Sequence, residues 1–356
     1  MNHLKKEFQV TVNSIFPWNS SLWDSLLGNP ASLPHALLLA GPGGVGKSRF
    51  AAAMAARLLC EQPRGSWACG ECDACRWQAG GNHPDFRKVT LEVDDAEGDE
   101  ASTKASSKKS GVATQIKIHQ IRALEDFVFV GSHRHGNRVV IVDPADAMNG
   151  AAANSLLKIL EEPPPSVYFI MVSSKWRSLL PTLRSRCRKV LFGVPETGAA
   201  VAWLKQAGIK DPEMELGLAG GAPLRALARS ERGTKDSTAE IIAPLSRQPL
   251  DPLTLAAHWE SQLKVNPELN LENLVDTVQK WLHDLIRVRA ALAPRYLARE
   301  NENLSRLAAT ADPARLNRCH DSLLKVRATA RHPLNTLLFL EDLAARCAVA
   351  LTPARH

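Results

Sequence analysis

The chain has 356 residues, of which 45% are hydrophobic and 23% are charged, a balance that is ordinary for a folded protein of two or three domains. Its formal net charge of +7 is modest and comes without a long basic block, so the composition permits an anionic partner without requiring one. The first residues lack the apolar core of a signal peptide, and no segment approaches the roughly 20 apolar residues of a membrane span, so we expect a cytoplasmic protein.

The first motif of chemical interest follows residues 35–40 (HALLLA), which have the pattern of a buried strand. The segment GPGGVGKS at 41–48 fits G-x-x-x-x-G-K-[ST] and leads into a predicted helix that runs to Leu59. Glycines in such a turn let backbone N–H groups converge on phosphate oxygens, while the lysine reaches the terminal phosphates and the serine holds Mg²⁺. The predicted nucleotide ligands are Gly41, Gly43, Gly44, Gly46, Lys47 and Ser48. Whether ATP or ADP occupies the loop stays open at this point.

Four cysteines come next, at the spacing C-x8-C-x2-C-x2-C within residues 60–75. Clustered cysteines in a reducing compartment are more often metal ligands than disulfide partners. Four thiolates complete a tetrahedral shell without an open position, so the pattern predicts a structural zinc site. The predicted ligands are Cys60, Cys69, Cys72 and Cys75. We expect the isolated Cys187, Cys319 and Cys347 to be packing residues.

Residues 94–111 are charged and small, so they cannot bury enough apolar surface to offset the entropy of ordering them. We therefore predict a disordered surface loop at 94–111, followed by a helix that extends through Val128.

A second predicted buried strand, residues 138–142 (RVVIV), ends in Asp143, which has the position of a Mg²⁺-binding carboxylate. ATPases of this type normally carry a glutamate after that aspartate, and it orients the attacking water. Here the next residue is Pro144, which has no side-chain acceptor. Because such help is worth roughly 10²–10⁴ in rate, we predict a site that binds nucleotide but hydrolyses it poorly. The alternative is that another carboxylate, such as Asp146, takes over this role.

An Ala- and Leu-rich helix is predicted at 151–162, because Pro163 to Pro165 cannot continue a helical hydrogen-bond ladder. A third buried strand follows at 168–172 (YFIMV), and strands that alternate with helices indicate a parallel sheet covered on both faces. Beyond about residue 193 helical patterns dominate.

Two further features come after the third strand. Ser173 and Ser174 end it where a hydroxyl can sense a γ-phosphate, and Ser174 is the predicted contact. The segment LRSRC at 183–187 follows on a short predicted helix. An arginine held there can reach the ATP of a neighbouring subunit, although surface arginines are more commonly just solvated.

Several motifs together resemble the bacterial clamp-loader subunits of the AAA+ class. They are GPGGVGKS, the four-cysteine group, NSLLKILEEPPP (154–165), LRSRC (183–187) and HPLNTLLFLEDLAARC (332–347). The resemblance implies that Arg186 is an arginine finger acting in trans and that Arg225 occupies the sensor-2 position.

The resemblance also implies an α/β AAA+ P-loop domain with a parallel sheet and an inserted zinc module, a small helical lid domain, and an all-α collar domain. The corresponding boundaries are 1–193, 194–245 and 246–356. The expected partners are delta and gamma/tau subunits in a hetero-pentamer that places a sliding clamp on primed DNA.

Because Pro144 departs from the hydrolysing gamma/tau members, we expect a non-hydrolysing partner with little or no ATPase activity of its own. The chain carries an intact phosphate loop, which leaves nucleotide binding open. Two alternatives are an autonomous ATPase of the gamma/tau type and a zinc-dependent nucleic-acid-binding module.

Overall fold

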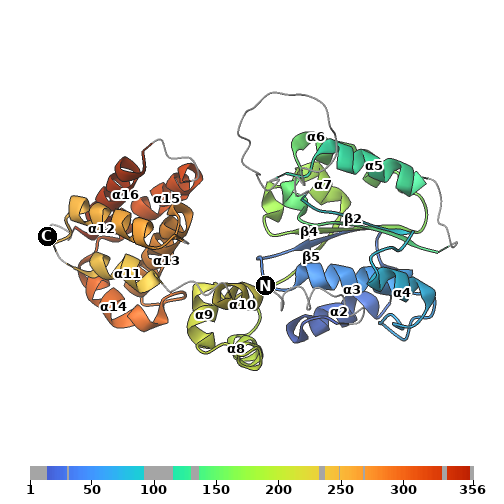
Figure 1. Cartoon of the computed structure of the whole chain (residues 1–356), viewed down its shortest axis with the longest axis horizontal. Helices are drawn as coiled ribbons and strands as arrows, with labels where there is room; N and C mark the ends of the chain where they lie inside the picture. The colour runs from blue at the N-terminus through green and yellow to red at the C-terminus, as the bar shows by residue number, and fades with distance from the viewer. Residues whose placement is uncertain are drawn as a thin grey trace. The chain divides into compact units, whose positions relative to one another are not determined.

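The computed structural model describes residues 14–29, 32–91, 115–129, 136–231, 237–247, 249–267, 269–330 and 335–352. The chain divides into two compact units, the first ending at Glu196 and the second beginning at Thr197 (Figure 1). The predicted loop at 94–111 lies outside the described residues. No helix of the described part of the chain is long and apolar enough to cross a membrane.

The first unit is built on a five-stranded sheet in which every described pairing is parallel. The spatial order is β2-β3-β4-β1-β5. The strands are β1 (Ala36–Ala40), β2 (Phe86–Val89), β3 (Arg138–Val142), β4 (Val167–Ser173) and β5 (Arg188–Leu191). The predicted parallel sheet and its three buried strands are thus confirmed, because β1, β3 and β4 are the continuous apolar runs of the sequence.

The two edge strands, β2 and β5, were not predicted. Their sequences, FRKV and RKVL, carry two basic residues each, and most of their side chains are exposed or half-buried. An edge strand does not need a continuous apolar run, so its sequence carries little signal.

Helices cover both faces of this sheet, with α5, α6 and α7 on one face and α2, α3 and α4 on the other (Figure 1). Alternate residues of β1, namely Ala36, Leu38 and Ala40, pack into one core with α5, α6 and α7. The helical segments are η1 (Pro17–Asn19), α2 (Ser20–Leu27), α3 (Lys47–Leu59), α4 (Asp73–Ala79), α5 (Ile118–Phe129), η3 (Ala145–Ala147), α6 (Gly150–Glu161), η4 (Trp176–Ser178) and α7 (Pro181–Arg186).

The second unit is helical, and its described residues contain no strand. A small core joins α8, α9 and α10, and a larger one joins α11 to α16 around Trp259 and Trp281. The elements are α8 (Thr197–Gln206), α9 (Pro212–Leu218), α10 (Pro223–Glu231), α11 (Thr238–Ile242), η5 (Ala243–Ser246), α12 (Pro252–Val265), α13 (Leu271–Arg289), η6 (Ala298–Glu300), α14 (Asn301–Thr310), α15 (Pro313–Thr329) and α16 (Thr336–Leu351). Leu218 of α9 belongs to the larger core, so the division of this unit into a lid and a collar near residue 245 stays a prediction.

A buried ion pair between Arg138 and Asp85 joins the start of β3 to the segment before β2. Arg138 Nε lies 3.2 Å from Asp85 Oδ1, and both side chains are at most 3% exposed. The guanidinium also donates to the Phe127 carbonyl and lies over the Phe127 ring, so one cation links β3, β2 and α5.

Replacing Asp85 with alanine leaves the Arg138 charge buried without its carboxylate. We expect Asp85→Ala to lower the free energy of unfolding by about 3–5 kcal/mol in urea denaturation followed by circular dichroism. The control is Glu71→Ala, which removes an ion pair to Arg64 whose side chains are 73% and 67% exposed, and it should change stability by less than about 1 kcal/mol. Equal effects of the two substitutions would contradict a structural role for the buried pair.

Candidate functional site

The glycine-rich loop at 41–46 connects the end of β1 to the start of α3, as the motif predicts. Gly46 has φ of 96°, and a Cβ there would lie 2.4 Å from the Phe16 ring. A Cβ on Gly41 would lie 2.2 Å from the carbonyl oxygen of Phe192. Both positions therefore require glycine, because a side chain would collide with neighbouring elements.

The side-chain amine of Lys47, at the end of the loop, is held by three hydrogen bonds. Its Nζ donates to the carbonyl oxygens of Gly41 at 2.8 Å and Pro42 at 2.5 Å, and to Ser174 Oγ at 3.2 Å. Burial lowers the pKa of Lys47 to about 8, while the nearby carboxylates of Asp143 and Asp146 act in the opposite direction. The structure thus brings together the predicted site residues Lys47, Asp143 and Ser174.

Asp146 is held by the end of β4. Its Oδ1 accepts hydrogen bonds from Ser173 Oγ at 2.6 Å and from the backbone N–H of Ser174 at 3.0 Å. The N–H of Lys175 lies 3.5 Å from the same oxygen. These donors fix the orientation of the carboxylate toward β4. Asp146 therefore holds the end of β4 through one carboxylate oxygen.

Residues just before α2 also contact the phosphate loop, and sequence reasoning missed them. Trp18 Nε1 and Asn19 Nδ2 both donate to the Val45 carbonyl, at 3.0 and 3.1 Å. A cavity of about 400 Å³ opens beside these two residues and is also lined by Leu22 and by residues 191–195. Its size falls in the range of small-ligand pockets. No spacing or motif marks these residues in the sequence, because they reach the loop only through the fold.

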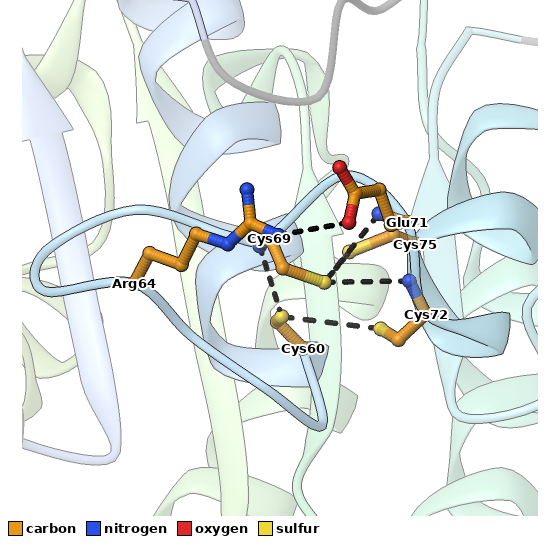
Figure 2. Close-up of polar contacts among 6 residues, drawn as sticks. All are labelled: Cys60, Arg64, Cys69, Glu71, Cys72 and Cys75. Atoms are coloured by element: carbon orange, nitrogen blue, oxygen red, sulfur yellow. Dashed lines mark hydrogen bonds and ion pairs between the residues drawn. The ribbon is translucent and has the colours of Figure 1, made fainter.

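The four predicted metal ligands converge (Figure 2). All four sulfur atoms lie within 4.8 Å of one another. The Sγ–Sγ distances are 3.9 Å for Cys60–Cys72 and 3.8 Å for Cys69–Cys75. A tetrahedral ion with metal–sulfur distances of about 2.3 Å places its sulfurs roughly 3.8 Å apart, so the geometry fits a single metal ion.

Backbone donors surround the same thiols. The N–H groups of Glu71 and Cys72 lie 3.4 and 3.3 Å from Cys69 Sγ and lower its pKa to about 6. The N–H of Cys69 in turn donates to Cys60 Sγ at 3.2 Å. Such donors stabilise thiolates, the form that binds metal. Four buried or half-buried cysteines with this arrangement can therefore hold a metal ion.

The other cysteines are buried, as expected for packing residues, and burial raises the pKa of Cys187 to about 12. His83 lies nearby in sequence but outside the thiol cluster, and its Nδ1 accepts the N–H of Asp85 at 3.0 Å.

Arg186 ends α7 and belongs to a different part of the first unit from the loop residues. Its guanidinium contacts Glu161 Oε1 at the end of α6 at 2.5 Å and the Thr182 carbonyl at 3.2 Å. The side chains of Arg186 and Glu161 are 35% and 49% exposed. Glu161 was not singled out from the sequence, although it lies in the segment NSLLKILEEPPP. Arg225 is exposed on α10 of the second unit.

Comparison with known proteins places these features in a family. A family model described as "DNA polymerase III, delta subunit" matches residues 25–196. The protein named DNA polymerase III subunit delta' of Pseudomonas aeruginosa is 37% identical over 254 residues, which cover 69% of this chain and 72% of that protein. The protein of the same name from Yersinia pestis is 31% identical over 281 residues, covering 76% and 75% of the two chains.

Among solved structures, a gamma subunit-related protein of DNA polymerase III from Thermotoga maritima aligns with 93% of this chain and 99% of its own. Its TM-score is 0.40 at 17% sequence identity, a similarity too low to add to the assignment.

The buried amine of Lys47 makes a prediction about pH. Its pKa is about 8 in the folded chain against 10.5 for an ordinary lysine, so between these values the unfolded chain binds more protons at this group. The contribution of Lys47 to stability therefore rises as pH increases from about 8 to about 10. We expect the urea midpoint of the unmodified chain to rise relative to that of Lys47→Met as the pH increases over this range. All other groups titrate alike in the two chains, so the difference reports on Lys47. Parallel pH profiles would contradict the lowered pKa.

Proposed function

The chain belongs to the family of DNA polymerase III delta' subunits, and on that basis we propose that it is the non-hydrolysing partner of an ATP-driven clamp loader. In this role it supplies Arg186 to the nucleotide of a neighbouring ATPase subunit while the sliding clamp is placed on primed DNA. The observation that carries the proposal is the end of β3, where Pro144 follows Asp143 and the nearest alternative, Asp146, is bound to the end of β4.

The lack of a water-orienting group supports the proposal in two steps. Proline offers no acceptor, and Asp146 already receives hydrogen bonds from Ser173 and Ser174 on one oxygen. These two bonds hold one oxygen of Asp146 at the end of β4, so the carboxylate already has a structural role there. The expected loss of general-base help, roughly 10²–10⁴ in rate, makes this chain a poor ATPase.

The phosphate loop nevertheless fits a nucleotide. Its required glycines bring the backbone close to a ligand, and a cationic Lys47 and the carboxylate of Asp143 lie at the same sheet edge. We propose that Lys47 and Ser48 hold phosphates and Mg²⁺ of ATP or ADP, with Ser174 as a further contact. The cavity beside Trp18 and Asn19 would take the rest of the nucleotide. Arg225 is proposed as the sensor-2 residue on the resemblance alone.

Arg186 is suited to act on another chain, because its ion pair with Glu161 is only a weak interaction within this one. The pair with Glu161 is more than one-third exposed on both sides, and pairs of this kind contribute about 0.2–1 kcal/mol. An arginine finger supplied in trans is worth roughly 10³–10⁵ in phosphoryl transfer. The guanidinium can therefore exchange Glu161 for a phosphate at small cost.

The proposed partners are gamma/tau and delta subunits in a hetero-pentamer. Residues 194–245 would form the lid domain and residues 246–356 the collar domain that holds the ring. An autonomous gamma/tau-type ATPase is the alternative that the intact phosphate loop favours, and steady-state hydrolysis by the isolated chain separates the two.

We expect the purified chain to hydrolyse no measurable ATP above a Lys47→Ala control. In a loader reconstituted with its ATPase subunits, Arg186→Ala should reduce turnover at the adjacent site by about 10³-fold or more, seen as a partial loss of DNA-stimulated hydrolysis by the whole ring. Arg122→Ala, an exposed arginine on α5, is the matched control and should leave turnover unchanged. Loader-like hydrolysis by the isolated chain, or full turnover with Arg186→Ala, would overturn the proposal.

The four-cysteine cluster is proposed to hold zinc, because four thiolates in a closed tetrahedron are typical of structural zinc sites. The ion would join the end of α3 to α4 and the loop between them, since Cys60 follows α3 and Cys75 lies on α4.

Elemental analysis of protein purified without chelator should give one zinc per chain. Cys72→Ala should lose the metal and lower the thermal unfolding temperature by about 10 °C or more, because the ion contributes directly to folding. Cys187→Ser is the matched control and should retain one zinc. A metal-free unmodified chain would rule out the assignment.

A further inference from the structure

One aromatic ring on the surface of the first unit is surrounded by cations. The guanidinium carbons of Arg177 and Arg184 lie 4.7 and 5.8 Å from the centroid of Trp176, and Lys189 Nζ lies 4.4 Å from it. The Trp176 ring itself is half-buried and packs against the core under α5, α6 and α7. The Trp176 patch consists of this ring together with Arg177, Arg184 and Lys189.

The three cations of the patch have no ion-pair partner among the described residues, and the nearby carboxylate of Asp146 accepts backbone N–H groups at the end of β4. The sequence carries no Asp or Glu between Glu162 and Glu196, a stretch that contains every cation of the patch. Across the described ranges of the chain, no carboxylate forms an ion pair with these three side chains. Arg184 Nε is buried without an acceptor among the described residues. Arg186, by contrast, has its carboxylate partner in Glu161.

This arrangement brings positive charges close together, and their mutual repulsion destabilises the isolated chain. Each cation over a tryptophan face gains about 0.5–1 kcal/mol at an exposed site. Two like charges 4 Å apart in water repel by about 1 kcal/mol, so the ring contacts offset the repulsion without exceeding it by much. The ring therefore holds the charged groups in fixed positions, and carboxylates or phosphates from another molecule would relieve the repulsion.

We propose that the Trp176 patch is a docking surface for an acidic face of the neighbouring clamp-loader subunit. The inference rests on the proposed function, because α7 carries both Arg184 of the patch and Arg186, the proposed finger. Residues two apart on a helix point in different directions, so α7 presents Arg184 to Trp176 and Arg186 to α6. A subunit whose nucleotide meets Arg186 would thus also lie within reach of the patch.

The cations that already lie over the Trp176 ring favour a protein partner over single-stranded nucleic acid. Proteins bind unpaired bases by stacking them on open aromatic faces. Here cations lie over Trp176 at 4.4 and 4.7 Å, so the ring serves as a support for charged groups. Duplex DNA would offer its phosphates to such a patch, so the experiment must distinguish binding of duplex DNA from binding of a protein partner.

The test uses the full-length chain with Arg177→Glu and Lys189→Glu combined, since both side chains are exposed and neither donates a hydrogen bond among the described residues. Association with a purified gamma/tau-type ATPase subunit is followed by stopped-flow at several salt concentrations. We expect the association rate constant to fall by about tenfold or more at low salt and to approach that of the unmodified chain at high salt, because electrostatic steering is screened.

Two control variants make the result decisive. The charge-conserving Arg177→Lys and Lys189→Arg pair should keep the original rate, and the reversal of two exposed cations elsewhere on the unit, Lys88→Glu and Arg122→Glu, should have a much smaller effect. An unchanged rate with the patch reversed overturns the inference, as does a loss of duplex-DNA binding with normal subunit association. If the unmodified chain joins no loader subunit at all, the proposed function fails as well, whereas normal assembly at an unaltered rate contradicts the patch alone.

Discussion

The structure of the first unit depends on β4 lying between β1 and β3 in a parallel sheet. The register pairs Ala40 with Ser173 across β1 and β4, and Val142 with Met171 across β3 and β4. All three strands therefore end at one edge, where the phosphate loop, the Asp143 turn and the Ser173–Ser174 step meet. The contacts that join Lys47, Asp146, Ser173 and Ser174 follow from this shared edge, because parallel strands direct their carboxyl ends the same way.

The same edge explains why this chain suits a supporting role. A hydrolysing site needs a carboxylate free to orient water, whereas here the carboxylate of Asp146 bonds to the end of β4. The amine of Lys47 donates hydrogen bonds to the carbonyl oxygens of Gly41 and Pro42 in the phosphate loop. The polar groups that the structure describes at this edge thus stabilise one another. The proposed function accordingly places the hydrolysis at the nucleotide of another subunit.

Charge is distributed in keeping with that assignment. The net charge of +7 is small for the whole chain, yet residues 163–195 contain six cations and no acid. Only Arg186 among these six has a carboxylate partner within the described residues. The excess of positive charge therefore gathers around η4, α7 and β5, next to the proposed finger. On the other side of the sheet, the four cysteines form a cluster that can hold a metal ion.

The sequence by itself determined the phosphate loop, the four metal ligands and the three central strands, because each depends on residues close together in the chain or on an apolar run buried on both faces. It also showed the end of α6, where three prolines follow. The tertiary structure alone decided the edge strands β2 and β5, whose charged residues carry no strand pattern. It alone decided the contacts that define the site's character, since these join residues 25 to 27 positions apart: Asp146 with Ser173, Asn19 with Val45, and Arg186 with Glu161. Such pairs have no fixed spacing in a sequence, and only the packing of strands and helices brings them within hydrogen-bonding distance.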